Sequence, residues 1–178
     1  SDEDRLREEA KKVADELRKL HEESHKRNKE IADELRKLHK KSHDDNKRIA
    51  DEITELLKRT KDKRTLEKLI EEARKKLEES LRRDAEISKK IAEDLERSLR
   101  EDAKISEDIR RRLKKLLEEV DKIEELRDRL RRVEEESREL HKRDREEVER
   151  IRRESEKLHR EDREDVKRIE KKLRDDAR

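Results

Sequence analysis

The sequence predicts an all-α protein that folds as an antiparallel, up-down-up bundle of three long and nearly untwisted helices. Three observations lead to this prediction. Leu, Ile, Val and Ala recur at helical spacing, the chain contains no Gly or Pro, and segments of 18 residues repeat along it. Because 18 residues make about five helical turns at about 3.6 residues per turn, the core face returns without drift, and straight helices are expected.

The repeat is visible directly in the sequence. Residues 14–31, ADELRKLHEESHKRNKEI, recur as residues 32–49, ADELRKLHKKSHDDNKRI. The core residues of 77–92 recur in 95–109, and those of 137–151 recur in 155–169. Each of the three expected helices therefore carries its own copy of the pattern, which favours one domain over residues 1–178.

The first helix is expected over residues 2–60. Its apolar and core polar residues are spaced alternately by three and four positions, and this periodicity falters at residues 59–64. Thr65 then offers an N-cap, so the second helix is expected over residues 65–119.

The second turn has a weaker signal, because neither Gly nor Pro marks it. Asp121 and Glu124 have the spacing of a capping box, which predicts a tight turn and a third helix over residues 122–176. Short connections make consecutive helices antiparallel neighbours.

Folding the helices back about these turns brings polar residues of the core face to two matched levels. The first polar layer would contain His21, Ser24, His25, Asn28, Ser98, Asp102, Ser106, Ser137, His141 and Asp144. The second polar layer would contain His39, Ser42, His43, Asn46, Ser80, Asp84, Ser88, Ser155, His159 and Asp162. Buried polar groups need partners, and Ser, Asn, Asp and His together can form a closed hydrogen-bond network.

The composition excludes several classes of partner. Charged residues make up 63% of the chain, yet they are finely interleaved and the net charge is only +2, which is typical of a solvated surface and not of a nucleic-acid interface. No segment is apolar enough to span a membrane, and no secretory signal is visible. We expect no cofactor, no bound metal and no small-molecule substrate, and the expected partner is the chain itself.

All six histidines lie at core or near-core positions of the predicted helices. A neutral imidazole accepts a hydrogen bond through its unprotonated nitrogen, and protonation removes that acceptor and buries a charge. If burial lowers the pKa of such a ring, the fold is stable above about pH 6.5 and loses stability as the pH falls. The histidines His21, His25, His39, His43, His141 and His159 are therefore predicted to sense pH, with a transition between about pH 4 and 6 that the core Asp residues complicate.

Three other interpretations stay open. The layers could only specify the register of the helices in a static bundle. The pairs His21/His25 and His39/His43 have chelating spacing and, with a third His and an Asp, could hold zinc. Long repeating helices also suit a homo-oligomer or filament whose assembly depends on pH. Catalysis is not expected, although Ser137, His141 and Asp144 supply the groups of a hydrolytic triad, because no oxyanion hole or pocket is evident.

The straight repeat, the Glu, Lys and Arg surface and the Ser, Asn, His and Asp layers resemble de novo designed helical bundles with buried histidine networks. The resemblance covers essentially the whole chain and is architectural. It implies a built pH switch, carried by the six histidines and their layer partners, and it implies a soluble recombinant protein without a natural cellular location. The core Asp residues depart from the simple scheme.

Overall fold

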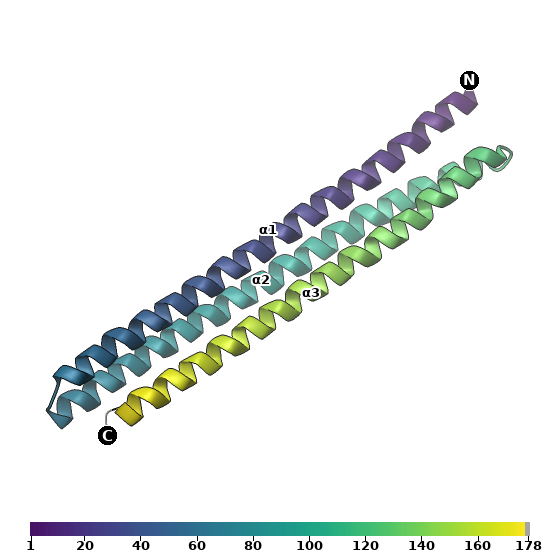
Figure 1. Cartoon of the computed structure of the whole chain (residues 1–178). Helices are drawn as coiled ribbons and strands as arrows, with labels where there is room; N and C mark the ends of the chain where they lie inside the picture. The colour runs from purple at the N-terminus through teal and green to yellow at the C-terminus, as the bar shows by residue number, and fades with distance from the viewer. Residues whose placement is uncertain (177–178) are drawn as a thin grey trace. The chain divides into compact units, whose positions relative to one another are not determined.

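A computed structural model describes residues 1–176, which form the three helices α1 (Asp2–Arg59), α2 (Lys63–Glu119) and α3 (Glu124–Asp176) (Figure 1). The all-α fold class with three helices is therefore confirmed. The ends of the helices differ from the expected ones by one or two residues. Acidic residues fill the first turns of α1 and α3, and basic residues the last turn of α1, in agreement with the direction of the helix dipole.

The α1–α2 turn differs from the expected one at its N-cap. α2 begins at Lys63, so Thr65 lies inside its first turn instead of capping it. Asp62 precedes the helix, and the Thr65 hydroxyl donates a hydrogen bond of 2.8 Å to the Asp62 carboxylate. The apolar pattern starts only at Leu66, which is why the sequence pointed to a later start.

The α2–α3 turn is tight, but α3 begins at Glu124, two residues later than expected, so Glu124 opens the helix instead of lying three positions after an Asp121 N-cap. The amide of Ile123 donates a hydrogen bond of 2.8 Å to the carbonyl of Val120. The carboxylate of Asp121 lies 3.7 Å from the guanidinium of Arg127, in the first turn of α3.

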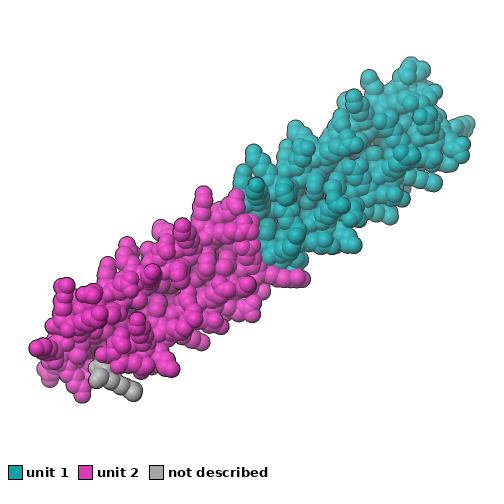
Figure 2. Space-filling view, viewed as in Figure 1, with its two compact units in different colours: residues 1–31, 94–151 teal, residues 32–93, 152–178 magenta. Residues whose placement is uncertain are grey.

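The described chain divides into two compact units, each built from segments of all three helices (Figure 2). Unit 1 comprises residues 1–31 and 94–151, and unit 2 comprises residues 32–93 and 152–178, of which residues 177–178 lie outside the described part. The expected single domain over residues 1–178 includes both units and stays a prediction.

In unit 1, α1 runs antiparallel to α2 and parallel to α3. Arg5 contacts Glu119 and Arg27 contacts Glu101, so the residue numbers of the α2 partners fall as those of α1 rise. The residue numbers of the α3 partners rise with those of α1, as the Arg18–Glu136 and His25–Glu147 contacts show. The apolar core of this unit holds Leu6, Ala10, Val13, Leu17, Leu20, Ile109, Leu113, Leu116, Val120, Leu126, Leu130 and Val133.

Unit 2 has an apolar cluster of its own, formed by Ile53, Leu57, Ala73 and Leu173, with Ile49, Leu66, Ile70 and Ile169 packed against it. Arg36 pairs with Glu154 at 3.0 Å and His43 with Asp165 at 3.2 Å, so α1 and α3 run parallel here as well. Burial of these side chains at helical spacing supplies the main driving force for packing.

No helix in the part of the chain that the structure describes is long and apolar enough to cross a membrane.

Candidate functional site

The polar residues of the core face are largely buried between the helices. In unit 1 the buried polar side chains of the first polar layer are Ser24, Asn28, Ser98, Asp102, Ser106, Ser137 and Asp144. In unit 2 those of the second polar layer are Asn46, Ser80, Asp84, Ser155 and Asp162. Ser42 and Ser88 are half-buried. Each unit therefore contains its own polar layer.

The histidines fall into two groups, and the expectation that all six lie in or near the core is wrong for two of them. His21, His39, His141 and His159 are half-buried. His25 and His43 are exposed, with 61% and 56% of their side-chain surface accessible. At about 100° per residue, a residue four positions after His21 or His39 lies about 40° further round the helix, on the outer side of the stripe.

The second polar layer contains a chain of four titratable groups from three helices. Nδ1 of His159 lies 3.0 Å from Oδ2 of Asp84, and Nδ1 of His39 lies 3.2 Å from Oδ2 of Asp162, both in hydrogen-bond geometry. The carboxyl group of Asp84 also acts on that of Asp162, whose pKa it raises through its charge and through hydrogen bonding. Two neighbouring carboxyl groups are stabilised when one of them carries a proton that they share.

That shared proton is reflected in the titration of Asp162. Burial raises the pKa of Asp162 to about 8, and the hydrogen bond and the negative charge of Asp84 act in the same direction. Asp165 raises it as well, and the charge of His43 opposes these effects. The second polar layer therefore binds a proton at neutral pH that ordinary carboxyl groups release.

The first polar layer is arranged differently, because an arginine reaches its central carboxylate. The guanidinium of Arg27 donates a hydrogen bond of 2.8 Å to Oδ1 of Asp102 and one of 3.1 Å to Glu101. The hydroxyl of Ser24 donates to Oδ2 of Asp102. Burial raises the pKa of Asp102, against the opposing effects of Ser24 and Arg27. Sequence reasoning missed Arg27, because it lies beside the core stripe among surface charges.

His159 bonds to Asp84 in the second layer, but His141, its equivalent in the first layer, makes no such bond to Asp102. Its Nδ1 is buried and has no hydrogen-bond partner among residues 1–176. Burial lowers the pKa of His141, the charges of Arg145 and Arg110 lower it further, and Asp102 opposes them. The interaction of His141 with Asp102 is thus an attraction between charges, since Arg27 and Ser24 bind the carboxylate.

The remaining carboxyl group of the first layer is Asp144. Nδ1 of His21 lies 3.2 Å from its Oδ1. Neither atom has a well-aligned hydrogen bond among the described residues. Burial raises the pKa of Asp144 to about 6, although the charge of His21 pulls it the other way.

Ser and Asn bridge α1 and α2 in both layers, with unequal quality. The Ser80 hydroxyl donates to Oδ1 of Asn46 at 2.7 Å, whereas the corresponding distance from Ser98 to Asn28 is 3.3 Å. Nδ2 of Asn28 and the hydroxyl of Ser137 are buried without a hydrogen-bond partner in the described part of the chain. The first layer is the less completely bonded of the two.

The sequence allowed a zinc site at the paired histidines. In residues 1–176, no group of three or more His, Asp or Glu side chains converges closely enough to hold a metal ion. The rings of His21 and His25 instead lie 6.5 Å apart and nearly parallel.

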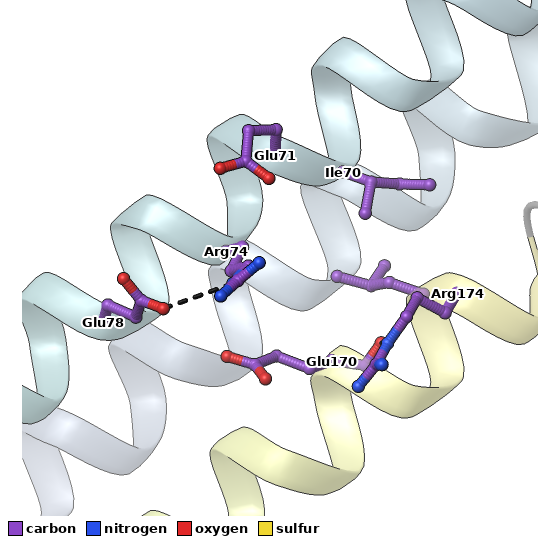
Figure 3. Close-up of a pocket in the computed structure, with 7 residues that line it drawn as sticks. Ile70, Glu71, Arg74, Glu78, Glu170 and Arg174 are labelled. Carbon is purple, nitrogen blue, oxygen red and sulfur yellow. Dashed lines mark hydrogen bonds and ion pairs between the residues drawn. The ribbon is translucent and has the colours of Figure 1, made fainter.

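A cavity of about 380 Å³ lies in unit 2, and the residues that line it do not belong to the polar layers. Figure 3 shows its charged lining, in which Arg74 pairs with Glu78 while Glu170 and Arg174 approach from α3. Ile70 and Leu173 supply its apolar part. Three acidic and two basic side chains form the rest of the lining, and Arg74 is already paired with Glu78.

The comparisons with known proteins address the fold. No protein-family model matches the sequence, and no curated protein is similar to it. The chain is similar in structure to a protein described as a computationally designed three helix bundle. The likeness covers 98% of this chain and 85% of the other, with a TM-score of 0.52 and 16% sequence identity. At this identity it supports the three-helix-bundle fold alone.

Proposed function

We propose that this chain is a designed structural protein whose two polar layers make its folding or assembly depend on pH, so that it is stable near neutral pH and disrupted by acid. The regular repeats, the absence of Gly and Pro and the likeness to a designed bundle support the designed origin. The proposal assigns the chain no catalytic role and no cofactor.

One observation carries the proposal: half-buried histidine rings face buried Asp carboxyl groups across helices in both layers. His21 faces Asp144, His39 faces Asp162 and His159 faces Asp84. Such a pair binds its first proton without a net charge, because the ring and the carboxyl group share it. A second proton leaves one uncompensated positive charge in a poorly solvated place, which costs free energy.

The direction of the acid effect follows from His141. The pKa of this ring is lowered in the fold, so the stability it contributes is present above the unfolded value of about 6.5 and is lost as the pH falls.

The carboxyl groups act in the opposite direction. Because the pKa values of Asp144 and Asp162 are raised, their contribution is largest at low pH and is lost as the pH rises through about 6 and about 8. Acid disruption must therefore come from the proton that His141 takes up and from the second proton of each His–Asp pair.

The experiment is a titration from about pH 8 to about pH 3 with chelator present. Circular dichroism would follow helix content, and size-exclusion light scattering would follow mass. We expect a steep loss of one or both between about pH 6 and about pH 4. Replacing all six histidines by Asn should abolish that loss, provided that circular dichroism shows the variant folded at about pH 8.

A flat response down to about pH 4 would contradict the proposal and leave the layers as groups that fix helix register. A transition that survives the six replacements would assign the acid response to carboxyl groups instead.

A further inference from the structure

The two layers come from the same repeat, but five residues of α1 differ between its two copies, and Arg27 is one of them. Shifting Arg27 by one repeat of 18 residues gives Asp45, and shifting Glu101 back by one repeat gives Arg83. The Arg27–Glu101 pair of unit 1, at 3.1 Å, thus has its charges reversed in unit 2. The carboxyl groups beside them, Asp102 and Asp84, are equivalent.

This difference decides which group binds the central carboxylate. In unit 1, Arg27 lies 2.8 Å from Asp102, and His141 has no hydrogen-bond partner among the described residues. In unit 2, Asp45 is too short to act in this way and has the wrong charge, and the ring of His159 lies 3.0 Å from Asp84. A guanidinium and an imidazole compete for one carboxylate, and the permanently charged guanidinium binds it where it is present.

We propose that Arg27 makes the first polar layer the acid-sensitive one, so that unit 1 opens at a higher pH than unit 2. The inference rests on the proposed function and states which polar layer responds to acid first. A proton added to His159 forms an ion pair with Asp84. A proton added to His141 finds no free carboxylate, and its charge favours the opened chain, where water solvates it.

The charged groups that face His141 come from all three helices. Arg145 of α3 and Arg110 of α2 repel its proton, and Asp102 of α2 attracts it. From α1, Arg27 compensates Asp102 and reduces that attraction. The remaining carboxyl group, Asp144, is paired with His21.

The groups in the second layer are more evenly matched. His159 faces Asp84 of α2. Asp84 in turn raises the pKa of Asp162. Asp162 faces His39 of α1. His43 pairs with Asp165 at the edge.

Hydrogen bonding within the layers also supports opening of unit 1 before unit 2. The first layer holds buried polar atoms without a hydrogen-bond partner on His21, Arg27, Asn28, Ser137, His141 and Asp144, whereas the second layer holds one, on Asp162, all judged over residues 1–176. An unsatisfied buried group costs about 1–3 kcal/mol. The first layer therefore has less hydrogen-bond stabilisation to lose.

The space for the missing arginine is present in unit 2. A cavity of about 130 Å³ there is lined by Leu38, Lys41, Ser42, Asp45, Ser80, Arg83, Asp84 and Ile87. In unit 1, the side chain of Arg27 lies between the equivalent positions of α1 and α2 and reaches Asp102. An arginine at position 45 can thus be introduced without overpacking the core.

The test measures hydrogen exchange of the full chain by mass spectrometry across the pH range, corrected for the intrinsic rate. Peptides of α1 from residues 14–31 and residues 32–49 report on unit 1 and unit 2. We expect the first set to lose protection at a pH higher by about one unit, the shift typical of a nearby charge.

Two reciprocal double variants, both without a change in net charge, test the role of Arg27. Arg27→Asp with Glu101→Arg gives unit 1 the pattern of unit 2 and should remove the difference between the units. Asp45→Arg with Arg83→Glu gives unit 2 the pattern of unit 1 and should make it open as early. Arg36→Asp, at a surface pair in unit 2, controls for a change of charge on α1.

A second readout separates this inference from the proposed function. NMR titration of the histidine rings in the folded protein should show that Arg27→Asp with Glu101→Arg raises the pKa of His141 by about one unit. An unchanged His141 titration would overturn the inference even if acid opens the chain. Simultaneous opening of both units in the wild type, or earlier opening of unit 2, would overturn it as well and leave the proposed function standing. A chain that stays closed to about pH 4 would refute the proposed function and the order of opening together, whereas the His141 titration would still decide the role of Arg27.

Discussion

Oδ2 of Asp84 lies 3.0 Å from Nδ1 of His159. The carboxyl group of Asp84 also raises the pKa of Asp162, so the proton on Asp162 depends on a second acidic side chain. This coupling gives the second layer a dependence on alkaline pH as well as on acid.

Asp162→Asn should remove the alkaline limb of the stability profile. The pKa of Asp162 is raised to about 8, so its stabilising proton is present below that value and is lost as the pH rises through it. Urea unfolding of the wild type should show a free energy lower by about 1 kcal/mol at about pH 9 than at about pH 7, whereas the variant should show none of this loss. Asp33→Asn, at the exposed Arg36 pair of the same unit, is the matched control and should behave as the wild type. Equal pH dependence in all three proteins would show that no shared proton exists.

Arg27→Met should destabilise the protein at neutral pH. The side chain of Asp102 is only 2% exposed, and without Arg27 its charge has no cationic hydrogen-bond donor. We expect a loss of about 1–3 kcal/mol in the free energy of unfolding. Arg36→Met breaks an exposed pair with Glu154 and should cost less than about 1 kcal/mol. Similar losses in both variants would mean that Arg27 acts as an ordinary surface charge.

His25→Gln and His43→Gln together should leave the acid transition unchanged. Both rings are more than half exposed, so water solvates their charged forms in the folded chain. The measurement is the midpoint of helix loss by circular dichroism from about pH 8 to about pH 3. His141→Gln should lower that midpoint in the same assay, and a larger effect of the exposed pair would reverse our assignment of the sensing rings.

The Ser–Asn bridges should differ in strength. Ser80 and Asn46 lie 2.7 Å apart, and Ser98 and Asn28 lie 3.3 Å apart. A double-mutant cycle of Ser80→Ala and Asn46→Ala should give a coupling of about 1 kcal/mol. The equivalent cycle at Ser98 and Asn28 should give clearly less. Equal couplings would show that the geometric difference has no energetic weight.

The sequence predicted the three helices and the levels of the polar residues, because both depend on helical periodicity, which is a local property. His25 and His43 were misplaced, since spacing along a helix places a residue on a face without showing where that face ends. The helix ends shifted by one or two residues, because Asp62 precedes α2 ahead of the first apolar residue.

Arg27 could not be identified from the apolar pattern. Its Cα position belongs to the solvated side of α1, and only its length brings the guanidinium to Asp102. One signal was available in the sequence: Arg27 is one of five residues of α1 that change between the two copies of the repeat, and it corresponds to Asp45. A departure from an otherwise close repeat therefore identifies a position at which two similar neighbourhoods differ in chemistry.

The same difference between the two copies of the repeat also affects how α1 aligns with the other helices. If α1 slid along its neighbours by one full repeat, the apolar residues would again meet apolar residues, and packing alone would hardly oppose the move. Asp45 would then take the place of Arg27 and face Glu101 and Asp102, so three carboxylates would meet where one guanidinium now joins two. The charge reversal at this position thus helps a nearly periodic chain to distinguish its intended alignment from the one displaced by 18 residues.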